Sequence, residues 1–130
     1  MKPEEWYREL ISTITEPDVK RAASIMLSHV GEENAIELRQ IALEAFGEYT
    51  TATERKTRII LERLVTEHGF AIGAYSGKSG RWLCKDGEEI QRVILDLQAR
   101  KKSLDERISA LRTAMSAQIR NQGRQLNFWR

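Results

Sequence analysis

One stretch, from residue 51 to residue 84, constrains the fold most, because it joins a long helical pattern to two short strand patterns. Threonines open it, and hydroxyl side chains are favoured where a helix begins. Gly69 follows the last residue of the helical pattern, where a left-handed conformation is commonly needed. The sequence therefore predicts a helix over residues 53–68. Its core-facing stripe consists of Thr57, Ile60, Leu61, Leu64 and Val65.

The segment after Gly69 predicts a tight β-hairpin. Residues 70–75 and 81–84 are rich in apolar and aromatic side chains, and the loop between them contains two glycines. Such loops suit two antiparallel strands. Lys78 makes the tip of the loop positive.

The predicted helix over residues 53–68 has a cationic side. At about 100° per residue, Arg55, Ile59, Arg63 and Thr66 project away from the apolar stripe, with Lys56 beside them. Arg58 adds a further positive charge. One side of the helix is thus suited to a protein core and the other to an anionic partner.

A basic helix that leads into a hairpin with a basic tip resembles the recognition helix and wing of a winged helix-turn-helix domain. Upstream, the segment Gly-Glu-Glu-Asn-Ala-Ile at residues 31–36, followed by apolar residues at helical spacing, resembles the loop and supporting helix of that fold. The likeness is to small winged-helix proteins of phages and prophages and spans roughly residues 20–97. It implies a mainly α fold with a small β-hairpin, in which a winged helix-turn-helix core is flanked by two further helices.

We therefore expect four parts along the chain. These are an N-terminal amphipathic helix within residues 1–16, a winged helix-turn-helix domain at 17–86, a long helix at 87–120 and a basic tail at 121–130. The first helix is predicted over residues 3–15, and the domain helices over 18–30 and 35–46. Apolar residues of the first helix are Trp6, Tyr7, Leu10, Ile11 and Ile14. Either Asn34 or Glu33 is expected to cap the helix at 35–46, whose inner face is Ile36 or Leu38, with Ile41, Ala42 and Ala45.

The long helix carries an apolar seam whose members are separated alternately by four and three residues. The seam consists of Ile90, Ile94, Leu97, Leu104, Ile108, Leu111 and Met115. Only Lys101 interrupts it. A heptad pattern of this length is typical of a coiled coil. The seam is expected to be covered either by the same seam of a second chain, giving a homodimer, or by the N-terminal helix.

Charge is unevenly distributed along the chain. Residues 1–50 have a net charge of −5, residues 51–85 of +4, residues 86–97 of −3 and residues 98–130 of +6. Positive charge thus gathers on the predicted helix and hairpin and again near the C-terminus, as binding to phosphate requires.

Several classes of function are not expected. Cys84 is the single cysteine and is interpreted as an apolar filler, and two histidines do not suggest a metal site. Gly77-Lys78-Ser79 resembles the end of a phosphate-binding loop, but the required earlier glycine is replaced by Ile72. No apolar run approaches the roughly 20 residues that cross a bilayer. We therefore expect a cytoplasmic protein that is not an enzyme and has no cofactor, metal or membrane partner.

The resemblance predicts a protein that binds double-stranded DNA, as a dimeric regulator of transcription or replication. Arg55 and Arg63 would reach base edges, while Lys56 and Arg58 would contact phosphates. The hairpin would add Lys78 and Arg81, with short hydrogen bonds from Thr53 and Ser79. The alternative is a winged-helix module that binds another protein within a replication or phage-related complex and has no DNA binding of its own.

Overall fold

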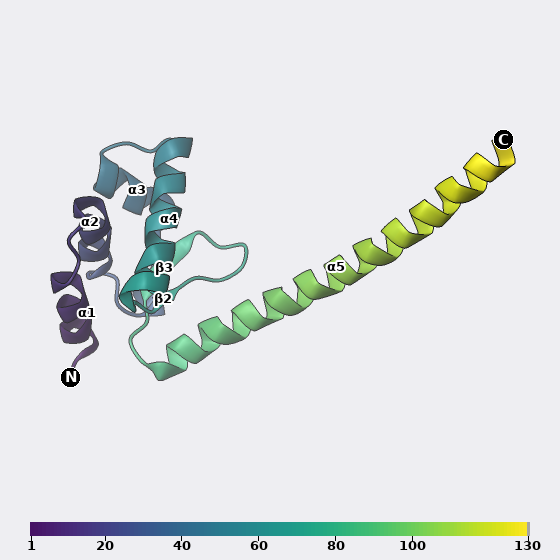
Figure 1. The fold of residues 1–130 in the computed structure, drawn as a ribbon. Helices are drawn as coiled ribbons and strands as arrows, with labels where there is room; N and C mark the ends of the chain where they lie inside the picture. Colours follow the sequence, from purple (N-terminus) through teal and green to yellow (C-terminus); the bar gives the residue numbers. More distant parts are fainter. Residues whose placement is uncertain (130) are drawn as a thin grey trace. The chain divides into compact units, whose positions relative to one another are not determined.

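The computed structural model describes the backbone of residues 1–129 and the side chains of residues 1–123. The chain divides into two compact units, Met1–Ile94 and Leu95–Arg130, which are described separately. The elements of the first unit are α1 (Pro3–Ser12), α2 (Pro17–Met26), a 3₁₀ turn η1 (Glu32–Asn34), β1 (Ile36–Glu37), α3 (Leu38–Phe46), α4 (Thr51–His68), β2 (Ile72–Gly73) and β3 (Gly80–Leu83). The long helix α5 (Gly87–Trp129) begins in the first unit and continues through the second. The prediction of a mainly helical chain with a long C-terminal helix is confirmed, and the predicted β-hairpin is part of a three-stranded sheet (Figure 1).

Helices α2, α3 and α4 pack on one another around the core of the first unit. The helix α4 is capped at its start by Thr50, whose side chain accepts a hydrogen bond from the backbone N–H of Thr53, and at its end by Gly69, which has a φ of 76°. The predicted end of this helix is therefore confirmed. Its core contacts come from Thr57, Ile60, Leu61 and Leu64. Val65 was also predicted to face the core, but 43% of it is exposed, because the buried stripe is narrower than the pattern suggested.

A short antiparallel sheet closes one side of the first unit, in the order β1-β3-β2. Ile36 pairs with Arg81 and Ile72 pairs with Leu83. The prediction of a helix over residues 35–46, capped by Asn34 or Glu33, was wrong at its start. Ile36 and Glu37 are drawn into the sheet by β3, so the helix begins at Leu38 without a side-chain cap. The strands β2 and β3 are shorter than the predicted segments 70–75 and 81–84.

The N-terminal helix α1 packs into the core of the first unit. Tyr7, Ile11 and Ile14 are buried there, whereas Trp6 is partly exposed. The helix ends at Ser12 and not at residue 15, because Pro17 starts α2 and the chain must turn before it. Similarly, α2 ends at Met26 and not at residue 30, since the carbonyl oxygen of His29 accepts from the N–H of Leu83 in β3.

A buried carboxylate holds the start of α5 in the first unit. Glu89 is 2% exposed and accepts hydrogen bonds from the backbone N–H groups of Glu32 and Lys85, both at 3.1 Å. Asp86 caps the helix by accepting from the N–H of Glu89 at 2.9 Å. The sequence indicated only that acids at this position suit a helix N-terminus. The hydrogen bond between Glu89 and the η1 turn joins segments more than fifty residues apart in the chain.

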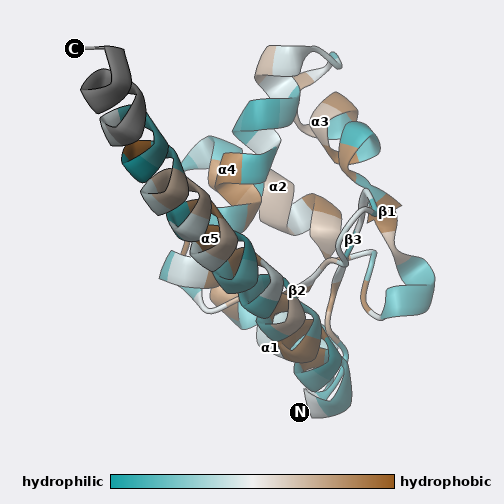
Figure 2. Ribbon diagram, turned by 90° about the vertical axis from the view of Figure 1, so that its right-hand side faces the viewer, coloured by the Kyte–Doolittle hydropathy of each residue, from teal (hydrophilic) through white to brown (hydrophobic). Residues whose placement is uncertain are grey.

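The helix α5 continues to Trp129, beyond the predicted end at residue 120. No proline interrupts it, and a single glycine such as Gly123 costs a helix only about 1 kcal/mol. The predicted basic tail at residues 121–130 is thus helical as far as residue 129, but Arg130 and the side chains of residues 124–130 lie outside the described residues. Figure 2 shows hydrophobic patches alternating with hydrophilic ones along α5. None of the described helices has the length and apolar character needed to span a membrane.

Candidate functional site

The first half of α4 presents a cationic surface. Arg55, Lys56 and Arg58 are all exposed, as the sequence predicted, while the opposite side of the helix faces the core. These three side chains lie in the first two turns of α4. In addition, the N-terminus of a helix carries a partial positive charge. This end of α4 is therefore suited to an anionic ligand.

Residues of α3 and of the turn that follows it support this cationic surface. The guanidinium of Arg39 lies 5.4 Å from the centre of the Tyr49 ring, and the ammonium of Lys56 lies 5.2 Å from the centre of the Phe46 ring. Cation–π contacts of this kind hold a long basic side chain without neutralising it. Sequence reasoning missed Arg39. Its spacing from the buried residues of α3 marks it as a surface residue but not as part of this site.

One acid lies among these bases. Glu54 accepts from the hydroxyl of Tyr49 at 2.6 Å and from the guanidinium of Arg58 at 2.7 Å. These two hydrogen bonds lower the pKa of the Glu54 carboxyl, and the same acid raises the pKa of Tyr49. Glu54 therefore remains charged at neutral pH and orients Arg58 along the helix.

Thr53 does not offer its hydroxyl to a ligand, contrary to the prediction. It is buried, its hydroxyl lies 3.1 Å from the carbonyl oxygen of Glu48, and it accepts from the backbone N–H of Thr50 at 2.8 Å. The side chain is used to fix the turn between α3 and α4. Its role is to position the cationic surface.

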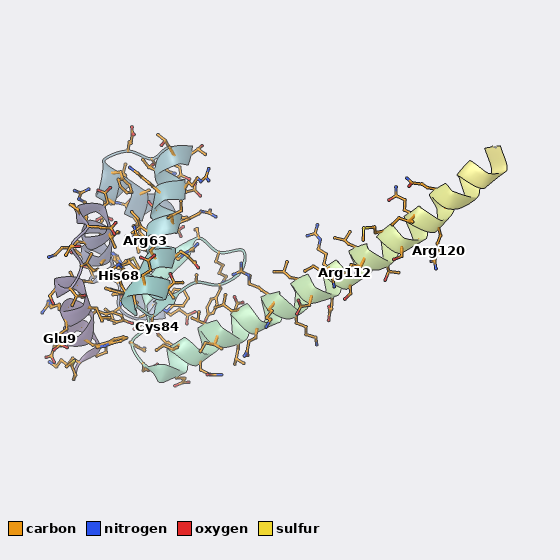
Figure 3. The ribbon with its side chains drawn as sticks, in the orientation of Figure 1. Glu9, Arg63, His68, Cys84, Arg112 and Arg120 are labelled. Atoms are coloured by element: carbon orange, nitrogen blue, oxygen red, sulfur yellow. The ribbon has the colours of Figure 1, made fainter. Side chains whose placement is uncertain are left out.

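Arg63 is likewise engaged within the protein. Its guanidinium donates to both carboxylate oxygens of Glu16, at 2.6 and 2.9 Å, and to Glu67 at 3.1 Å. Figure 3 labels Arg63 on the side of α4 that faces α2, and Glu16 is the residue that precedes α2. The prediction that Arg63 projects directly away from the core was wrong, because Glu62 occupies that direction and Arg63 lies at the flank. Arg63 thus ties α4 to the start of α2.

The contact between Glu16 and Arg63 should make the protein sensitive to acid. The hydrogen bonds from Arg63 lower the pKa of the Glu16 carboxyl below its ordinary value of 4.5. A carboxyl whose pKa is lowered by folding stabilises the protein above its unfolded pKa, and this contribution is lost as the pH falls through the folded value. We expect Glu16→Gln to melt at a lower temperature than wild type near neutral pH, and this difference to shrink as the pH falls below the ordinary carboxyl pKa of 4.5. Thermal melts monitored by circular dichroism would measure this. A gap that stays constant with pH would contradict the role of the pair.

The loop between β2 and β3 is fastened to the start of α3. The N–H of Leu38 donates to the carbonyl oxygen of Ser79 at 3.1 Å, and the Ser79 hydroxyl donates to Glu37. Arg81 donates to the carbonyl oxygens of Lys78 and Gly80 and shapes the loop. Lys78 itself is exposed, as predicted. The backbone of the loop is therefore joined to α3 directly before Arg39, the residue that contacts Tyr49.

Two other kinds of site, a metal centre and a reactive thiol, are not supported by the described part of the chain. Among those residues, no group of three or more His, Cys, Asp or Glu side chains is placed to hold a metal ion. Cys84 is buried, and burial raises the pKa of its thiol to about 11. Its interpretation as an apolar filler is confirmed, since a thiolate is disfavoured there.

Comparison of the chain with models of protein families, with curated proteins and with solved structures found no match.

Proposed function

We propose that the protein binds double-stranded DNA through the first half of α4 and the loop between β2 and β3. One observation carries the proposal. The loop is bonded through Ser79 to Leu38 at the start of α3, and the next residue, Arg39, is linked through Tyr49 and Glu54 to Arg58 on α4. The exposed bases along this series of contacts would follow a phosphate backbone while the helix lies in a groove.

The order of the elements supports a winged helix-turn-helix fold. A helix, a strand, two helices and a hairpin follow one another as α2, β1, α3, α4, β2 and β3, and the first strand pairs with the last. In such a fold α4 is the recognition helix and the loop between β2 and β3 is the wing. The strand that sequence reasoning missed, β1, is thus an element that this fold requires.

The bases have different roles in this proposal. Arg55 lies on the outward side of α4 and would pair with a base edge in the major groove, where a guanidinium suits guanine. Arg39, Lys56 and Arg58 would contact phosphates. On the wing, Lys78 would lie along the backbone or an adjacent minor groove, and Arg81 would hold the loop in shape through its hydrogen bonds to the carbonyl oxygens of Lys78 and Gly80. Thr53 and Arg63 are left out of the interface because their hydrogen bonds hold the protein together.

The protein would act as a dimer in regulating transcription or replication, as the resemblance to small phage and prophage regulators implies. Such a regulator works in the cytoplasm. The dimer would form through the apolar seam of α5, whose residues from Ile94 to Met115 are between 40% and 60% exposed in the single chain.

Fluorescence anisotropy with labelled duplex DNA of mixed sequence tests the proposal. We expect wild type to bind with an affinity that falls steeply as salt rises from about 50 to 300 mM, because phosphate contacts release counterions. The double variant Arg55→Ala/Lys78→Ala should bind at least about tenfold more weakly. A matched control, Arg8→Ala/Lys20→Ala, removes two exposed charges from α1 and α2 and should bind nearly as wild type.

Two results would count against DNA binding. One is the absence of binding at the low-salt end of the range. The other is an equal loss of affinity in the matched control, which would indicate only a general attraction between a positive protein and DNA. Circular dichroism of each variant ensures that a lost interaction is not a lost fold.

A second candidate function is supported by two apolar residues on α4. Ile59 is 51% exposed and Val65 is 43% exposed, and exposed apolar side chains on one helix are suited to packing against another protein. A protein that packs on these residues and pairs acids with Arg55 would make the domain an interaction module. Ile59→Ser should leave DNA binding nearly unchanged if DNA is the ligand. If the ligand is instead a protein that packs on α4, the same substitution should weaken binding of that protein.

A further inference from the structure

The exposed seam of α5 has an internal order that points to one particular partner. Writing the heptad with positions a to g, the seam places Ile94, Ile108 and Met115 at a. Leu97, Leu104 and Leu111 fall at d. All six are exposed in the single chain. Ile at a with Leu at d is the combination that favours two parallel strands.

The N-terminal helix is not free to cover this seam. Its own apolar side is occupied, since Tyr7 and Ile11 are buried in the core of the first unit, as is Ile14 just after the helix. The alternative left open by the sequence, in which α1 covers α5, is therefore disfavoured. A second copy of the chain supplies a seam of matching length and spacing.

Lys101 and the charges beside it favour one orientation of that copy. Lys101 occupies the a position between Leu97 and Leu104, and a single basic residue at a specifies a two-stranded coil and its register at a cost in stability. In a parallel pair, Arg100 at g faces Asp105 at e of the second chain, twice per dimer. An antiparallel pair centred between Lys101 and Leu104 would place Arg100 against Arg107 instead.

The parallel arrangement also brings together two like charges, Arg107 and Arg112 of the second chain. In the antiparallel arrangement, Asp105 would face Gln98 and Arg112 would face Gln91 of the second chain. Neither pair is attractive, so nothing at these positions offsets the repulsion between Arg100 and Arg107. The residues of the seam and the charges beside it therefore both favour the parallel arrangement. We infer that two copies of this chain join α5 in parallel and in register, with the two Lys101 side chains at the same level.

A parallel coil would bear on how a dimer meets DNA, a consequence that rests on the proposed function. Both helices α5 begin at the same end of a parallel coil, so both first units are attached there. The two copies of α4 would then engage two half-sites on one duplex, related by the two-fold symmetry of the dimer. An antiparallel coil would separate the two attachment points by most of the length of the helix.

Disulfide formation between single cysteines tests the orientation without any DNA. Gln118 lies at d, beyond the last leucine of the seam, whereas Ser116 lies at b on the outer side. Under mild oxidation of the full chain, we expect Gln118→Cys to form covalent dimers and Ser116→Cys to form few. Wild type serves as the control for Cys84, which is buried and should not cross-link.

Several results would overturn the inference. If Gln118→Cys cross-links no better than Ser116→Cys, the chains are not parallel and in register. If it instead cross-links preferentially to Gly87→Cys in a mixture of the two variants, the coil is antiparallel. A monomer by light scattering, in the same sample, would refute the coil itself. Because none of these measurements contains DNA, a failure here is distinct from a failure of DNA binding.

Discussion

Gly73→Ala should destabilise the first unit more than any other single-methyl change at a described glycine. A Cβ built on Gly73 overlaps the ring of Trp82, with Cε2, Cζ2 and Nε1 as its nearest atoms. The ring has little room to retreat, since Trp82 is 3% exposed and packs beside Tyr75 with 5.2 Å between ring centres. Because the two residues are directly paired in the sheet, a shift of either also disturbs the β2–β3 ladder.

We expect a loss of about 3 kcal/mol in the free energy of unfolding, the upper part of the range for overpacked cores. Urea denaturation followed by circular dichroism measures it. The matched control is Gly87→Ala at the start of α5, where a Cβ meets nothing within 4 Å, and this variant should unfold within about 0.5 kcal/mol of wild type. Equal stability of the two variants would show that the Trp82 ring does not lie against Gly73.

The second large effect is expected at Tyr7. Its side chain is fully buried, its ring lies 5.7 Å from that of Phe70, and its hydroxyl donates to the carbonyl oxygen of Cys84 at 2.7 Å. The carbonyl oxygen of Ala71 is also near this hydroxyl, at 3.2 Å. One residue thus joins α1 to the residue before β2 and the residue after β3, and burial raises the pKa of the Tyr7 hydroxyl above the ordinary value of 10.0.

Tyr7→Ala should cost about 3 to 5 kcal/mol, as for other large aromatic truncations in a core. Tyr7→Phe keeps the ring and removes only the hydroxyl, so it should cost about 1 to 2 kcal/mol, mainly because a buried carbonyl loses its partner. The same urea titrations separate the two contributions. If Tyr7→Phe is as stable as wild type, the hydrogen bonds to the hairpin contribute nothing, and α1 is held by packing alone.

The structure also indicates how these changes would reach the proposed interface. Gly73 and Trp82 lie in β2 and β3, on either side of the loop that carries Lys78. Tyr7 contacts Cys84, at the other end of β3 from this loop. We therefore expect Gly73→Ala to weaken DNA binding even under conditions where most of the protein remains folded.

Much of the candidate site could be predicted from local pattern. The exposed positions of Arg55, Lys56 and Arg58 follow from helical periodicity, which needs only neighbouring residues. The glycine that ends α4 and the exposed lysine at the tip of the hairpin loop were predicted in the same way. Such features depend on steric and hydrophobic preferences that act over a few residues.

The remaining features depended on residues far apart in the sequence. Arg63 lies at the flank of α4, and only the tertiary structure brings Glu16, 47 positions earlier, to bind its guanidinium. Arg39 became part of the site only when the turn placed Tyr49 beneath it. Neither event leaves a periodic signal, because each depends on where two helices come together.

For the fold, the sequence alone determined α4, its cationic side and the heptad seam of α5, since all three are written in spacings of three and four residues. Only the tertiary structure decided that Ile36 and Glu37 form a strand, because their backbone groups pair with β3 more than forty residues later. It also decided that Glu89 is buried, where two backbone N–H groups offset the cost of removing a carboxylate from water. Local periodicity encodes which face of an element is apolar, whereas pairing between distant segments is set by how the chain packs.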